Sequence, residues 1–428
     1  MMQLNSYTSS FKGHEIMKKY LYPITETLLT LMIFALIMSA LIPLVENKQS
    51  YVKYKAFYDN PEEYDVLFCG DSHMMNTAYT MELWKNHGIR AYNIANSAES
   101  MPVTYYVIKN ALDHCDPKVI VIDTFFTYNN RIMTAGKEML PHQYFDMLPL
   151  SKNKIEAVNC LFDSRETRFG YLFDFSLYHS RWNKLERGDF FPEYNGFGGA
   201  EPLLASYTVK PPSDKMSKKH DMAKRPEEYL GKIKSLCDER GIKLICVMNP
   251  YAMWFENKTG NVDFEKTFSK LGIEFIDLRE SDLVDIYADS GDVAHLNMTG
   301  ARKVTDFYGK YLTEHSYVPD PAPCDEALWN KNYEYYIEKK KAVFPMAADC
   351  AGVLSDLNDP DFIFDLTLRK GYVPEGTIAL MLDNARSCDN VNISAEGEAD
   401  YDITVRIRPA AGGDYFFEKS YRISSSSL

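Results

Sequence analysis

Apolar residues are grouped along the chain into one long run and a series of short ones. The long run, residues 27–45, is uncharged, apolar on all sides and about as long as a bilayer core requires of a helix. A buried core helix is usually amphipathic, and a cleaved signal peptide has a shorter apolar stretch with a small-residue cleavage site. We therefore predict a single transmembrane helix. Lysines flank it on both sides, so charge alone does not predict its orientation.

After this run, short segments rich in Val and Ile alternate with helical patterns. Segments typical of buried parallel strands occur at residues 66–69, 91–95, 119–123, 243–248 and 274–277. Helical patterns occur at residues 80–86, 102–114 and 226–240. The alternation predicts an α/β fold with a doubly wound, mostly parallel five-stranded sheet, in which the carboxyl ends of the strands converge on one crevice.

The periodicity changes again toward the C-terminus. Residues 362–368, 378–382 and 401–407 resemble strands separated by Gly, Asn, Asp and Pro turns, and they predict a small antiparallel β domain. Residues 329–344, rich in Tyr and Lys, predict a helical connection before it. Carbohydrate binding and packing against the preceding domain are both open as roles for this β domain.

These patterns divide the chain into four parts. We expect an N-terminal segment and anchor at 1–50, a main domain at 51–320, a helical connection at 321–346 and the β domain at 347–428. The main domain carries an insertion at about 124–221, rich in aromatic, Gly and polar residues, which we expect over the strand ends, where loops line a site. Tyr178, His179 and Arg181 within it are candidate substrate contacts; the alternative is a packed insertion helix with a capped His and a surface Arg.

Composition excludes several classes of function. The net charge of -13 and the lack of a basic stripe argue against a nucleic-acid partner. The eight cysteines include no Cys-x-x-Cys pair, and the histidines form no cluster with ligand spacing, so we predict no metal site. Gly-rich phosphate-binding motifs are missing as well, and we expect no cofactor.

Two short motifs at opposite ends of the main domain carry candidate chemistry. Gly70-Asp71-Ser72 follows the first predicted strand, and Asp292 lies three residues before His295 ahead of a predicted helix. A serine hydroxyl needs a base to take its proton, and the base needs an acid that holds its tautomer. Ser72, His295 and Asp292 are therefore the predicted catalytic residues.

The two motifs resemble the signature blocks of the SGNH/GDSL hydrolase superfamily over roughly residues 64–313. Tyr178 to Trp182, followed by Gly196-Phe197, is similar to its membrane-anchored branch, which includes the D-alanine transfer protein of teichoic acid synthesis and the alginate acetylation proteins. The resemblance implies a cell-membrane protein with a single span and an extracytoplasmic catalytic domain. It also implies as partners an acyl donor, a glycan acceptor and a multi-spanning membrane acyltransferase.

The resemblance also implies where an oxyanion would be bound. The backbone N–H of Ser72 is one expected donor, and Ala98 occupies the second block where Gly is usual, so it remains a second backbone donor. The third block, Gly-x-Asn-Asp, is absent, and Thr124 is only a weak substitute for its Asn. Asn249, after the fourth predicted strand, is a further candidate substrate contact.

The sequence thus favours a membrane-anchored serine esterase or O-acyltransferase that acts on acyl esters of a cell-envelope glycan through an acyl-serine intermediate. A lipase or thioesterase of a small acyl ester is the first alternative. A catalytically degenerate scaffold in a polymer-modifying complex is the second. Hydrolysis and transfer remain open, as do the acyl group and the acceptor.

Overall fold

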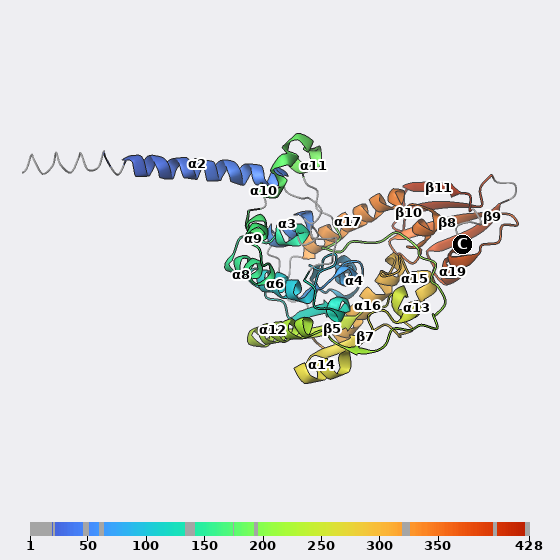
Figure 1. Cartoon of the computed structure of the whole chain (residues 1–428). Coiled ribbons are helices and arrows are strands. Elements are labelled where there is room, and N and C mark those ends of the chain that lie inside the picture. Colours follow the sequence, from blue (N-terminus) through green and yellow to red (C-terminus); the bar gives the residue numbers. More distant parts are fainter. Residues whose placement is uncertain are drawn as a thin grey trace, which may run out of the picture.

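The computed structural model describes residues 19, 22–45, 51–59, 64–132, 142–173, 175–191, 196–318, 326–396 and 400–423. A globular part carries one long helix, α2 (Tyr22–Val45), that projects from it (Figure 1). This helix is long and apolar enough to cross a membrane, and most of its side chains lie outside the protein core. The predicted apolar helix is therefore present.

A parallel sheet forms the centre of the globular part, in the order β2-β1-β3-β5-β7. Its strands are β1 (Val66–Cys69), β2 (Ala91–Asn93), β3 (Val119–Asp123), β5 (Lys243–Met248) and β7 (Glu274–Asp277). The predicted doubly wound, five-stranded parallel sheet is confirmed. Only the second strand is shorter than the sequence pattern indicated.

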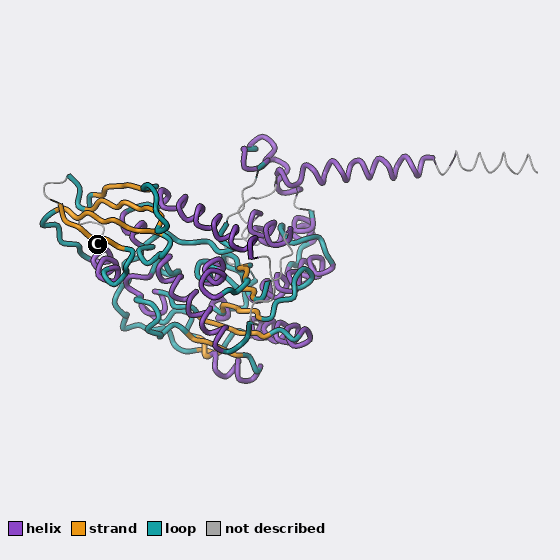
Figure 2. Tube along the Cα trace, turned by 180° about the vertical axis from the view of Figure 1, so that it is seen from behind, coloured by secondary structure: helices purple, strands orange, loops and turns teal. Residues whose placement is uncertain are grey.

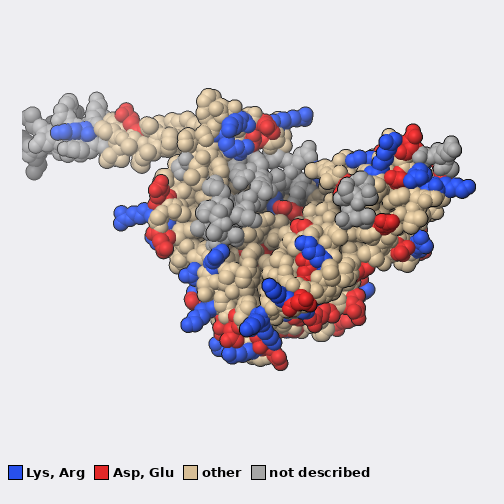
Figure 3. All heavy atoms as spheres, turned by 45° about the vertical axis from the view of Figure 1, so that its right-hand side comes forward, with Lys and Arg blue, Asp and Glu red and all other residues tan. Residues whose placement is uncertain are grey.

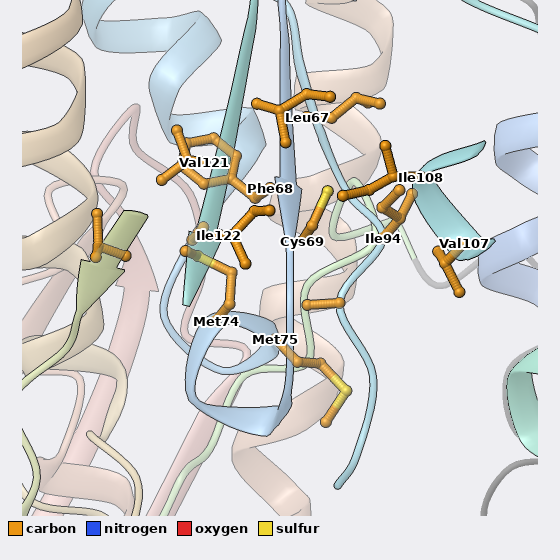
Figure 4. Packing of buried hydrophobic residues seen from close by; sticks show 14 of the residues in the cluster. Leu67, Phe68, Cys69, Met74, Met75, Ile94, Val107, Ile108, Val121 and Ile122 are labelled. Carbon is orange, nitrogen blue, oxygen red and sulfur yellow. The ribbon is translucent and has the colours of Figure 1, made fainter. Parts of the chain in front are cut away.

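Helices cover the sheet and bury its apolar side chains (Figure 2). One packed group contains α6 (Met101–Ala111), α8 (Lys152–Leu161), α12 (Lys224–Arg240) and α14 (Phe264–Leu271). Another contains α5 (Thr80–His87), α16 (Met298–Glu314) and α17 (Glu326–Val343). Phe68 and Cys69 project to opposite sides of β1 (Figure 4), so this strand is buried on both faces, as a central parallel strand must be.

Short elements connect this framework. They are α3 (Tyr51–Asp59), α4 (Ser72–Met75), η2 (Phe125–Tyr128), β4 (His220–Asp221), α13 (Ala252–Asn257), β6 (Val262–Asp263) and α15 (Ile286–Asp289). The predicted insertion contains α7 (His142–Phe145), α8, α9 (Arg165–Leu172), α10 (Phe175–Tyr178), η3 (His179–Lys184) and α11 (Arg187–Phe190). Of these, α10, η3 and α11 pack against α2, and α8 packs on α6.

A second sheet and a second hydrophobic core lie at the C-terminal end of the chain, opposite α2 (Figure 1). The sheet has the order β11-β10-β8-β9, built from β8 (Phe362–Arg369), β9 (Val391–Glu396), β10 (Ile403–Pro409) and β11 (Phe417–Tyr421). It is reached through α17, η4 (Phe344–Met346) and α18 (Cys350–Leu354). Helix α17 lies where the helical connection was expected.

Two details of the C-terminal prediction are wrong. Residues 378–382 form part of a helix, α19 (Gly376–Ala385), because the buried residues Met381, Leu382 and Ala385 repeat with helical spacing. This helix connects β8 to β9, which pair in parallel, so the sheet is mixed and not wholly antiparallel.

A buried ionic network joins the two sheets. The guanidinium of Arg302 on α16 donates to the carboxylates of Glu82, Asp356 and Asp359 and to the amide oxygen of Asn358. Lys340 on α17 is fully buried and donates to Asp359 and Asp361. Charges this deeply buried are tolerated only when they are paired and hydrogen-bonded. The network therefore ties the loop before β8 to α5, α16 and α17.

Candidate active site

Ser72 lies where β1 ends and α4 begins. Gly70 between them has φ +120°, and a Cβ there would lie 3.1 Å from both the backbone nitrogen and the carbonyl oxygen of Asp123. Asp71 caps α4, because its Oδ1 accepts a hydrogen bond from the backbone N–H of His73 at 2.9 Å. The turn thus requires Gly and Asp at these positions, and it brings the serine to the carboxyl edge of the sheet.

Replacement of Gly70 by alanine is expected to destabilise the protein by about 1–3 kcal/mol, because the φ angle suits only glycine and the new methyl group meets the backbone of β3. Chemical denaturation measures the loss. Gly88→Ala is the matched control, since Gly88 has φ +65° and open space around its Cβ position. A Gly70→Ala protein as stable as Gly88→Ala would contradict the close approach described here.

His295 and Asp292 lie on one tight loop next to Ser72. Oδ1 of Asp292 accepts hydrogen bonds from the backbone N–H groups of Ala294 and His295, and Oδ2 lies 2.8 Å from Nδ1 of His295. Nε2 of His295 lies 2.8 Å from Oγ of Ser72. A carboxylate can only accept, so Nδ1 carries the proton and Nε2 is free to accept the proton of the serine.

The electrostatics of the loop favour this arrangement. Burial alone would raise the pKa of Asp292, but the hydrogen bond from His295 and the charge of that ring outweigh burial and hold the pKa below its ordinary value. The carboxylate is thus ionised and able to stabilise an imidazolium that forms during reaction. The structure therefore brings together the three residues for which the sequence predicts catalytic roles.

Two backbone N–H groups, those of Ser72 and Ala98, are expected to bind an oxyanion. Ser72 is the first residue of α4, so its N–H has no partner within the helix. Ala98, in the loop after β2, has φ +53°, the left-handed conformation that glycine normally provides. The backbone at Ala98 thus keeps the conformation expected where the resembling family has Gly.

Residues of helix α3 hold the loop after β2, which carries Ala98, in place. Nζ of the buried Lys53 donates to the carbonyl oxygen of Ala95, and the side chain of Asn96 donates to the hydroxyl of Tyr54 at 2.6 Å and to the carboxylate of Glu99. Burial lowers the pKa of Lys53 and raises that of Glu99, each to about 8. Lys53 and Glu99 are both missing from the sequence prediction. Nothing local marks the contact of Lys53 with Ala95, which lies 42 residues further along the chain.

The position of the missing third block offers no side-chain donor. Thr124 is fully buried, and its hydroxyl donates to the carbonyl oxygen of Val247 at 2.9 Å, so the weak substitution expected of it is wrong. Asn249 is also buried: Nδ2 donates to Asp123 and Oδ1 accepts from Tyr308. Both polar atoms are occupied inside the protein, so Asn249 supports the strand ends and does not face a substrate.

His73, next to Ser72 in the chain, packs beside the ring of His295. It is 3% exposed, its ring stacks on Phe125 with centroids 3.9 Å apart, and it lies 5.3 Å from the ring of His295. Burial, with the neighbouring His295, lowers its pKa well below the ordinary value. His73 is therefore uncharged and packs against the catalytic residues.

A small cavity of about 50 Å³ opens next to Ala98. It is lined by Ala98, Ser100, Phe126, Tyr128, Asn129, Arg131 and Ile132.

The other predicted contacts lie elsewhere. Tyr178 is buried and donates to Asp146 at 2.8 Å, and Arg181 donates to the carbonyl oxygen of Val45 at the end of α2 at 2.8 Å. His179 is exposed on η3, which packs against the same helix. Tyr178, His179 and Arg181 therefore surround the end of α2 and do not line the site at Ser72.

Among the described residues, no group of His, Cys, Asp and Glu is placed to hold a metal ion.

No family model and no curated protein matches the chain. Among solved structures, it is similar to a protein from Bacteroides fragilis assigned as an acylhydrolase, with 11% identity over 63% of this chain and 99% of the other, at a TM-score of 0.29. A GDSL-like lipase from Bacteroides thetaiotaomicron has 9% identity over 62% and 99%, at a TM-score of 0.28. An acetyl xylan esterase from Butyrivibrio proteoclasticus has 8% identity over 60% and 66%, at 0.24. TM-scores this low carry no functional argument, so we base the assignment on the site itself.

Proposed function

We propose that the chain is a membrane-anchored serine esterase or O-acyltransferase of the SGNH/GDSL type. The observation that supports this best is the chain of hydrogen bonds from Oγ of Ser72 through the ring of His295 to Asp292. In the first step Oγ attacks the acyl carbonyl while Nε2 takes its proton. The tetrahedral intermediate then expels the alcohol, which leaves with that proton, and the acyl group stays on Ser72.

The second step releases the acyl group to water or to another hydroxyl group. His295 takes the proton of the incoming hydroxyl, which attacks the acyl-serine, and returns the proton to Oγ as the intermediate collapses. Among the described residues, we assign the backbone N–H groups of Ser72 and Ala98 as the donors to this intermediate. Loss of one donor typically costs about 3 kcal/mol of transition-state stabilisation, which favours activated acyl donors over ordinary esters.

The substrate we propose is an acyl ester of a cell-envelope glycan. The apolar helix α2 supports a site held close to a membrane. The resemblance to the membrane-anchored branch supports an extracytoplasmic domain, with a donor delivered by a multi-spanning acyltransferase.

Comparison of envelope polymers from cells with wild-type protein and cells with Ser72→Ala tests this function. For transfer, we expect less O-acylation of the polymer in the mutant, measured by release of the acyl group in mild alkali. More O-acylation in the mutant would identify a deacylating esterase. No change would contradict an enzymatic role on the polymer and favour the scaffold.

A further inference from the structure

Exposed apolar side chains gather on the helices that surround the end of α2. We name residues 165–191, from α9 through α11, the collar. Its exposed apolar residues are Phe169, Phe173, Leu177, Trp182, Phe190 and Phe191. Trp182 and Phe191 are each 71% exposed. Large apolar patches are rare on soluble surfaces and usually mark a contact with another molecule or with a membrane.

The collar is fixed to α2 by specific contacts. Arg181 donates to the carbonyl oxygen of Val45, the last residue of α2, and forms an ion pair with the buried Asp189 at 3.0 Å. Helices α10 and α11 also pack against α2, and Figure 1 shows α9 and α10 on the side from which α2 projects. Where α2 leaves the bilayer, the collar is therefore at the height of the lipid headgroups.

Some polar side chains of the collar are paired. Tyr178 donates to Asp146, and the carboxylate of Asp189 accepts a hydrogen bond from the backbone N–H of Glu186 at the start of α11. The basic residues Arg165, Lys184 and Arg187 are exposed, and so are the acidic residues Glu166 and Glu186. Figure 3 shows basic and acidic side chains beside uncharged surface where α2 meets the globular part.

We propose that the collar lies in the interface between lipid and water and forms a second membrane contact beside α2. Aromatic rings, Trp above all, are enriched at that depth, and exposed Lys and Arg attract anionic headgroups. The inference rests on the proposed anchoring by α2. A single span leaves a domain free to rotate about it, whereas two contacts fix the orientation of the site at Ser72 relative to the membrane surface.

Trp182 serves as the probe of this contact. The full-length protein is reconstituted into vesicles of phosphatidylcholine and phosphatidylglycerol with brominated acyl chains, which quench tryptophan emission at short range. We expect strong quenching in the wild type and its loss in Trp182→Phe, because Trp254 and Trp329 are buried in the globular part and Trp84 is partly buried against Trp329. Phe190→Ser combined with Phe191→Ser is expected to reduce the quenching of Trp182.

The matched control moves the tryptophan to an exposed site of similar chemistry far from α2. Tyr401, 46% exposed in the C-terminal part, is replaced by Trp in the Trp182→Phe background, and no quenching is expected there. Flotation of the vesicles reports anchoring by α2 separately. Protein that floats while Trp182 stays unquenched would overturn the collar contact and leave the anchor intact. The protein could instead form a dimer that dissociates in Phe191→Ser, with Trp182 unquenched. That result would show that the collar contacts a second copy of the chain, and it would also overturn the proposal. If the protein did not float with the vesicles, both the anchoring by α2 and the membrane contact of the collar would be refuted.

Discussion

Replacing Ser72 by alanine is expected to abolish labelling by a fluorophosphonate probe and to lower esterase activity on the order of 10⁴-fold or more. The probe reacts only with a serine whose proton has an acceptor, which His295 provides at 2.8 Å. His295→Ala is expected to lose about as much activity, since the members of such a group act as a unit. Detergent-solubilised full-length protein and a short-chain aryl ester serve for both measurements.

Two surface variants control for nonspecific effects of substitution. Ser235 is exposed on α12 and His220 is exposed at β4, so Ser235→Ala and His220→Ala are expected to keep labelling and activity. Equal labelling of the wild type and Ser72→Ala would refute the assigned nucleophile. Full activity in His295→Ala would refute the assignment of His295 as the general base.

Replacing Arg302 by methionine is expected to destabilise the protein by about 3–5 kcal/mol, because it leaves buried carboxylates without their cation. The substitution removes the cation that pairs with Glu82, Asp356 and Asp359. Of these three carboxylates, Lys340 contacts only Asp359. Arg302→Lys keeps the charge but lacks the planar fork, so a smaller loss is expected. Chemical denaturation measures all three proteins.

The exposed ion pair between Arg386 and Asp383 provides the control. Both side chains are about two-thirds exposed or more, and Arg386→Met is expected to change stability by less than about 0.5 kcal/mol. If Arg302→Met were as stable as Arg386→Met, the two sheets would not depend on the buried network for their attachment.

The sequence predicts the sheet well because its signals are local. Strands β1, β3 and β5 are short runs rich in Val, Ile and Leu, and the structure follows those runs closely. Residues 378–382 show where local signals are ambiguous. An apolar run of that length fits a strand or a buried helix, and only the spacing through Ala385 favours the helix that forms.

The site is predictable only where its residues lie in recognisable local motifs. Ser72 and His295 are marked by a turn and a loop, which sequence displays directly. Tyr178 and Arg181 contact Asp146 and Val45, and no local pattern indicates such partners. The prediction for Thr124 is wrong for a related reason. Its hydroxyl donates to the carbonyl oxygen of Val247 on a neighbouring strand, and no local pattern indicates that contact.

Helix α3 decides where the protein can be cut from its anchor without loss of the site. Tyr54 and Phe57 are almost fully buried, and Lys53 holds the loop that carries Ala98. A protease that released the domain by cleaving before Tyr51 would leave these contacts in place. Cleavage between α3 and β1 would strip the support from the loop and expose the apolar surface under α3, so the shed protein would be folded but poorly active.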